Sequence, residues 1–149
     1  MRKILFLVIV SVMLSACSVY NAVDVNTKLG LDTDQSISNI QTMSSQQLLG
    51  VSNNNLCVAY YQNKPPLIKK EIERRGLISE DSAKTVWSWD DINAHEVKKG
   101  MSLCSVLAAL GKPSSMTAGN QLLELDYPGQ VIVLMKDHKA HTYRVNTVN

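Results

Sequence analysis

Apolar residues recur at helical spacing through the middle of the chain and at strand spacing near its end. The helical pattern is clearest in residues 103–110, where leucine and valine recur every three or four positions. Serine, asparagine and proline at helix starts, and glycine at helix ends, mark further helices. The predicted helices begin at Ser44, after Ser52, at Pro66, at Ser79 and after Ser102.

Three runs with strand character follow the last predicted helix. They span Gln121–Tyr127, Val131–Met135 and His141–Val145, with turns at Pro128-Gly129 and at residues 136–139. Helices followed by strands indicate an α+β fold, in which N-terminal helices pack on a three-stranded antiparallel meander. Every residue of Val131–Met135 is apolar, which places this strand at the centre of the sheet.

The central strand carries apolar residues on both sides, although helices can cover only one side. Either Val131, Val133 and Met135, or Ile132 and Leu134, must therefore find another cover. Exposed apolar patches of this kind usually mark interfaces, so Ile132 and Leu134 are candidates for partner binding.

The N-terminus has the pattern of a secretory signal peptide. Two basic residues precede an apolar run, and Leu14-Ser15-Ala16-Cys17 follows. This ending resembles the bacterial lipobox, which implies cleavage before Cys17 and lipidation of that cysteine. The alternatives are an ordinary signal peptide that happens to adjoin a cysteine, and a transmembrane anchor, for which the apolar run is too short.

The residue after Cys17 indicates which of the two bacterial membranes would hold the protein. In the lipoproteins that this pattern resembles, Asp at that position retains the protein at the inner membrane, and here the residue is Ser18. The resemblance implies an outer-membrane location, with the protein facing the periplasm. The organisation that we predict is a signal peptide (1–16), a lipidated cysteine with a flexible tether (17–43), a helical segment (44–92) and an α+β domain (93–149).

The charge of the chain excludes one class of partner. The formal net charge is +2, and cleavage removes Arg2 and Lys3, which brings the mature chain to zero. A neutral chain has no electrostatic footprint for nucleic acid, so we expect no nucleic-acid partner.

Two cysteines remain after Cys17. In an oxidising compartment, Cys57 and Cys104 are expected to form a disulfide. The alternative is a pair of buried free thiols that do not meet.

The helix at 103–110 and its flanks resemble a known family. Val97, Gly100-Met101-Ser102, Val106-Leu107 and Leu110-Gly111-x-Pro113, followed by strands with Tyr127, look like the SmpA/OmlA/BamE-like lipoprotein domain over about residues 92–146. The preceding segment, from Leu56 to Ile92, is similar to one found ahead of this domain in uncharacterised envelope lipoproteins. The resemblance implies a small α+β interaction domain whose partner is an envelope protein, with the β-barrel assembly machinery as one candidate.

Charged and aromatic residues of the helical segment supply further candidates for partner binding. Lys69, Lys70, Arg74 and Arg75 flank two glutamates on one predicted helix, which makes them either a solvated face or a binding surface. We expect Glu71 and Arg75 to form an exposed pair. Trp87 and Trp89 cannot both face the same side of a helix, so one is expected in the core and the other, for which Trp87 is our candidate, at an interface.

No pattern in the chain favours an enzyme. A Gly-rich phosphate loop, a serine nucleophile elbow and paired inward carboxylates are all missing from the sequence. Asp137-His138-x-x-His141 lies across a predicted hairpin turn without a third ligand nearby, so we expect neither a metal nor a cofactor.

The function expected from the sequence is that of a non-catalytic outer-membrane lipoprotein. It would act as a protein-interaction accessory in envelope or outer-membrane protein assembly. Two alternatives stay open: an inhibitor-like periplasmic protein that captures an enzyme or toxin, and, from another class, a small periplasmic hydrolase.

Overall fold

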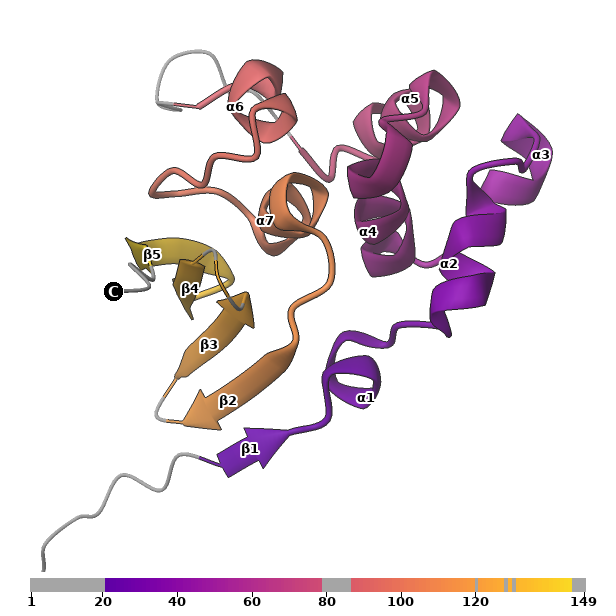
Figure 1. The fold of residues 1–149 in the computed structure, drawn as a ribbon. Coiled ribbons are helices and arrows are strands. Elements are labelled where there is room, and N and C mark those ends of the chain that lie inside the picture. Colours follow the sequence, from indigo (N-terminus) through magenta and orange to yellow (C-terminus); the bar gives the residue numbers. More distant parts are fainter. Residues whose placement is uncertain (1–20, 79–86, 120, 128, 130, 146–149) are drawn as a thin grey trace, which may run out of the picture.

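The computed structural model describes residues 21–78, 87–119, 121–127, 129 and 131–145 (Figure 1). The predicted signal peptide and Cys17 lie outside the described residues, as does the first part of the helix expected from Ser79. Within the described ranges, helices pack on one face of an antiparallel sheet, which confirms the α+β class.

The sheet has five strands in the order β1-β2-β3-β4-β5, and all neighbours are antiparallel. The last three strands form the expected meander, but the expectation of a three-stranded sheet is wrong. The sequence pattern did not predict the two strands at the other edge. Asn21–Val23 is too short to show alternation, and Ser115–Gly119 contains only one large apolar side chain. The strands are β1 Asn21–Val23, β2 Ser115–Gly119, β3 Leu122–Tyr127, β4 Val131–Lys136 and β5 Lys139–Val145.

A tight turn joins β4 to β5. Asp137 and His138 both have left-handed backbone conformations, with φ of 50° and 62°. Two such residues in succession are typical of a type I′ hairpin turn, which matches the twist of the flanking strands. Both side chains are exposed, as expected of a polar hairpin tip.

Seven helices appear within the described residues, and serine side chains cap most of their N-termini. Ser44, Ser52 and Ser102 each accept a hydrogen bond from the backbone N–H three residues on, which satisfies a donor that the helix cannot. The helices are α1 Val25–Leu29, α2 Asp34–Ile40, α3 Ser45–Leu48, α4 Asn53–Asn63, α5 Pro66–Arg74, α6 Trp89–Asn93 and α7 Leu103–Leu110.

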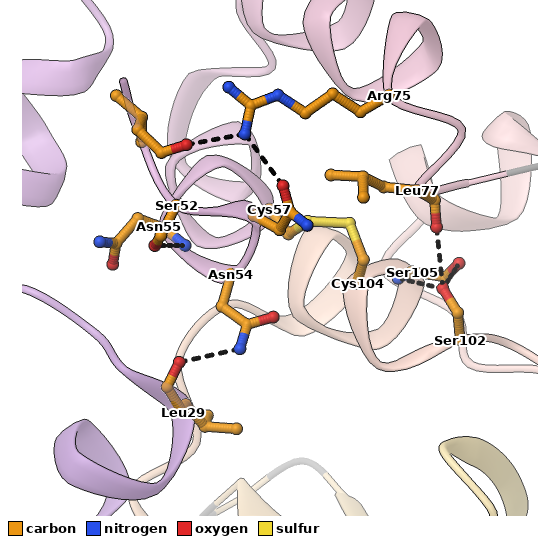
Figure 2. Close-up of a disulfide and its surroundings, with 12 residues drawn as sticks. Leu29, Ser52, Asn54, Asn55, Cys57, Arg75, Leu77, Ser102, Cys104 and Ser105 are labelled. Atoms are coloured by element: carbon orange, nitrogen blue, oxygen red, sulfur yellow. Dashed lines mark hydrogen bonds between the residues drawn. A yellow bond between two sulfur atoms is a disulfide. The ribbon is translucent and has the colours of Figure 1, made fainter. Parts of the chain in front are cut away.

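The flexible tether predicted for residues 17–43 is wrong from Asn21 onward. This segment forms β1, α1 and α2, and it buries five apolar side chains in the core: Val25, Leu29, Leu31, Ile37 and Ile40. Polar contacts fasten it to α4, since the Asn54 side chain donates to the Leu29 carbonyl at 2.8 Å (Figure 2). The buried Asn55 side chain accepts from the Asp32 N–H at 3.0 Å and donates to the Asp32 carboxylate at 2.7 Å.

Helix α7 lies between the sheet and α4 (Figure 1). Every residue from Cys104 to Leu110 is buried, so the helix has no solvated face. An element that is apolar all round must be covered on all sides.

A disulfide links α4 to α7 (Figure 2). The Cα atoms of Cys57 and Cys104 lie 5.4 Å apart, within the range that a disulfide can bridge. The geometric condition for the predicted pairing is therefore met, at a sequence separation of 47 residues.

We expect reduction of this disulfide to lower the free energy of unfolding by roughly 4 kcal/mol, because closing a loop of this length removes entropy from the unfolded chain. Urea unfolding with and without reductant measures the difference. The double variant Cys57→Ala/Cys104→Ala should match the reduced protein. Alkylation of both cysteines in denaturant without reductant would refute the pairing.

The two faces of β4 differ in exposure. Val131, Val133 and Met135 are buried on the face that the helices cover, whereas Ile132 and Leu134 are partly exposed on the opposite face. The sheet therefore has one core face, and the two candidates for partner binding lie on the other.

Charge substitutions should separate these faces. Val131→Asp with Val133→Asp places carboxylates in the core and should cost about 4 kcal/mol or more, enough to unfold a small domain. Ile132→Asp with Leu134→Asp should leave the melting temperature nearly unchanged. Thermal unfolding followed by circular dichroism compares them, and unfolding of both double variants would show that the outer face is covered as well.

Candidate functional site

The basic residues of α5 do not act as one surface. Lys70 and Arg74 are exposed, and Lys69 lies 3.8 Å from Glu73 with its Nζ 4.7 Å from the ring centroid of Trp89. Arg75 differs from the others because its side chain is only 16% exposed. The candidate set thus divides into two exposed side chains, Lys70 and Arg74, of which Arg74 is also paired with Glu71, and two that lie against neighbouring residues, Lys69 and Arg75.

Glu71 is buried and Arg75 is mostly shielded from solvent, so the expectation of an exposed pair is wrong. The Glu71 carboxylate accepts from Arg75 Nε at 2.7 Å and from Arg74 Nε and Nη2, each at 2.7 Å. Arg75 also donates to the carbonyls of Leu48 and Val51, both at 2.7 Å. It thereby ties the end of α5 to carbonyls at and just beyond the C-terminal end of α3.

This network sets the ionisation of Glu71. Hydrogen bonds from Arg74, and next from Arg75, lower the pKa of Glu71 to about 2. The same contacts raise the pKa of Arg74. The carboxylate is therefore charged at all physiological pH values and orients Arg75, which makes the contacts to the end of α3.

A groove runs between α3 and α5, directly beside this network. Its cavity volume is about 270 Å³. Leu49 and Leu67 line it and are 55% and 48% exposed, unusually high for side chains of this size. Lys70 and Arg74 line the same groove, so two of the predicted basic candidates meet two apolar side chains that sequence reasoning missed.

A signal for the missed leucines was present. Leu48 and Ile68 are buried, and each is followed or preceded by a second apolar residue that must point elsewhere on a helix. Leu49 and Leu67 are those second residues. We refer to Leu49, Leu67, Lys70 and Arg74 as the α3–α5 groove residues.

Both tryptophans are buried, so the expectation that one of them is an interface anchor is wrong. Trp87 and Trp89 are 7% and 9% exposed. Trp89 packs edge-on against Tyr60, with ring centroids 5.2 Å apart, and begins α6 behind the Ser88 cap. Because α6 starts only at Trp89, the two residues do not share a helix, and the argument from helical spacing does not apply.

Ile132 and Leu134 are not part of the groove. They lie on β4, whereas Figure 1 shows α3 and α5 on the far side of α7 and α4 from the sheet. The structure brings Lys70 and Arg74 together with the leucines and leaves the sheet candidates as a separate surface.

Two polar side chains that line a second cavity already have partners within the protein. This cavity, of about 540 Å³, is lined by His95, Lys98 and Tyr143, but His95 Nδ1 lies 2.7 Å from the Ala109 carbonyl oxygen, and Lys98 pairs with Glu96. Among the residues that the structure describes, no three His, Cys, Asp or Glu side chains gather where they could hold a metal ion. Within the same ranges, no helix is long and apolar enough to cross a membrane.

No protein-family model, curated protein or solved structure matches the chain.

The Glu71 network predicts a specific dependence of stability on pH. Its folded-state pKa of about 2 lies below the ordinary value of 4.5, so the unfolded chain binds the proton first as pH falls. The stabilisation from Glu71 is therefore complete above pH 4.5 and lost as pH falls towards 2. Urea unfolding midpoints at pH 7, 4.5, 3 and 2 measure this loss.

The variant Glu71→Gln should have a lower midpoint at pH 7 and a flatter profile between pH 4.5 and 2. Glu73→Gln on the same helix is the matched control, because the Glu73 side chain is 47% exposed. Parallel profiles for wild type and Glu71→Gln would contradict the structural role of the network.

Proposed function

We propose that this protein is a lipid-anchored, non-catalytic binding module of the outer membrane, facing the periplasm, whose α3–α5 groove receives a segment of an envelope protein. The observation that carries the proposal is the groove itself. Two leucines about half exposed flank a hollow with two cations at its rim. Exposed apolar side chains that gather around a hollow are typical of protein interfaces.

The size of the groove favours a protein over a small molecule. Pockets for small ligands usually measure about 300–1,000 Å³ and enclose most of the ligand. The groove, at about 270 Å³, suits one or two side chains of a protein segment. Leu49 and Leu67 would supply the buried centre of such an interface.

The charge of the groove indicates what the segment carries. Lys70 and Arg74 lie on the rim, and Glu71 is neutralised by its two arginines. Complementary charge favours correct partners and speeds encounter. The partner segment therefore carries an apolar side chain that enters the groove and acidic residues next to it.

The membrane address rests on the Leu-Ser-Ala-Cys pattern that ends at Cys17. The resemblance to the SmpA/OmlA/BamE-like domain supports a role in envelope assembly, and it makes the β-barrel assembly machinery a partner to test first. An inhibitor-like protein would use the same groove to hold a soluble enzyme or toxin. Partner identification decides between these two.

We expect the double variant Leu49→Asp/Leu67→Asp to bind its partner about tenfold more weakly or worse, since a truncated interface centre typically costs that much. Lys70→Glu should weaken binding and reduce its salt dependence, since Arg74 stays on the rim. The measurement is affinity purification of the full-length protein from solubilised envelopes, with partners identified by mass and then titrated in pure form.

Tyr143→Asp is the matched control, because Tyr143 is also a large exposed apolar residue, 42% exposed, but lies on β5. It should fold and bind as wild type does. Equal partner recovery by wild type and the double leucine variant would overturn the groove as the binding site. Recovery of no stoichiometric partner by wild type would overturn the binding function.

A further inference from the structure

The folded part of the chain begins very close to the predicted lipid anchor. β1 starts at Asn21, four residues after Cys17. An extended chain spans at most about 3.6 Å per residue, so Asn21 lies within about 14 Å of the lipidated cysteine. The protein therefore cannot stand clear of the membrane as a tethered domain would.

Strand pairing shows which end of the protein this short connection holds. Asn21 pairs with Ala118, and the same row continues through Leu123 and Met135 to Ala140. The turns that follow Gly119 and Lys136 lie just beyond this row. Asn21 and these two turns therefore share one end of the sheet, which we call the anchor end.

The anchor end carries more positive than negative charge. Lys136 and Lys139 flank the β4–β5 turn and are exposed, and the turn itself adds Asp137. Lys28 of α1 lines the same hollow as Gly119, Asp137 and His138. Basic residues within reach of an anionic leaflet are attracted to its headgroups.

The α3–α5 groove lies at the other end of the molecule. Figure 1 shows β1 at one extreme and α3 and α5 at the other, with α7 and α4 between them. An anchor at one extreme leaves the other pointing away from the bilayer.

We propose that the anchor end rests on the anionic phospholipid headgroups of the membrane that holds Cys17, with Lys28, Lys136 and Lys139 facing the lipid, so that the α3–α5 groove points into the aqueous space. This inference rests on the proposed lipid anchor. The short connection restricts the distance, and the lysines select the face. A partner is then met on the side of the protein that faces away from the bilayer.

The test places the mature, acylated full chain in nanodiscs of phosphatidylcholine and phosphatidylglycerol that contain a gadolinium-chelating lipid. Paramagnetic broadening of backbone amide signals reports proximity to the headgroups. The amides of Gly119 and His138 should broaden strongly, while those of Leu49 and Leu67 keep their intensity. Broadening that is strongest at Leu49 and Leu67, or equal across the protein, overturns the orientation.

A separate experiment tests whether the lysines contribute to docking on the membrane. Lys136→Gln with Lys139→Gln should shift the equilibrium between docked and undocked states by about fivefold per lysine. Broadening at Gly119 and His138 should then fall, as it should in nanodiscs of phosphatidylcholine alone. Lys70→Gln is the matched control at the groove end and should leave the broadening at Gly119 and His138 unchanged. Unchanged broadening in the double lysine variant overturns the role of the lysines.

The experiment distinguishes an error in the predicted lipid anchor from an error in the proposed orientation. Cys17→Ala should elute separately from the nanodiscs and show no broadening. A wild-type protein whose mass lacks acyl chains would overturn the anchor and this inference together. An acylated protein that stays with the nanodiscs but shows the wrong pattern overturns the orientation alone.

Discussion

Burial of α7 on all sides is the constraint on which the rest of the structure depends. A helix of eight mostly apolar residues can be stable only if it is covered by the sheet on one side and by helices on the other. α4 supplies the second cover, and the Cys57–Cys104 disulfide fixes the two helices at close range. The layered arrangement of sheet, α7 and outer helices follows from this requirement.

The close packing around α7 also explains why a glycine follows its last residue. Gly111 has φ of 79°, and a Cβ built there would lie 2.7 Å from the Tyr61 ring of α4. Any larger residue would clash with this ring and force it to move. The Tyr127 hydroxyl of β3 donates to the Gly111 carbonyl at 3.2 Å, so the helix end is held from the sheet side as well. The glycine of the Leu-Gly-x-Pro pattern is thus required by packing, whatever the function of the protein.

Local signals in the sequence predicted local structure well. Serine caps, the Pro66 start of α5, the Gly111 stop and the three-stranded meander all follow from chemistry within a few residues. What escaped prediction depends on contacts between distant segments. Residues 21–43 look polar because their few apolar side chains are widely spaced, and Asn54 and Asn55 hold them in place from more than twenty residues away.

The candidate site shows the same division. Lys70 and Arg74 were identified from charge. Leu49 and Leu67, which line the same groove, could not be placed beside them from the sequence, because the groove exists only where α3 packs against α5. Glu71 and Arg75 were expected in solvent because an i,i+4 pair of this type normally lies there. Arg75 turns inward because its guanidinium donates to the carbonyls of Leu48 and Val51, and hydrogen bonds from two arginines compensate for the burial of Glu71.

A folded N-terminus changes what the lipid anchor would do. A chain of about 25 flexible residues would have let the protein reach roughly 25–30 Å from the membrane in any orientation. With the chain folded from Asn21 onward, a lipid on Cys17 would instead restrict the orientation, because it would hold the adjacent end of the sheet close to the membrane. Restricting orientation lowers the entropy that a bound partner must remove. Asn54 and Asn55 of α4, which carry no candidate function of their own, would then serve binding indirectly by keeping residues 21–43 folded.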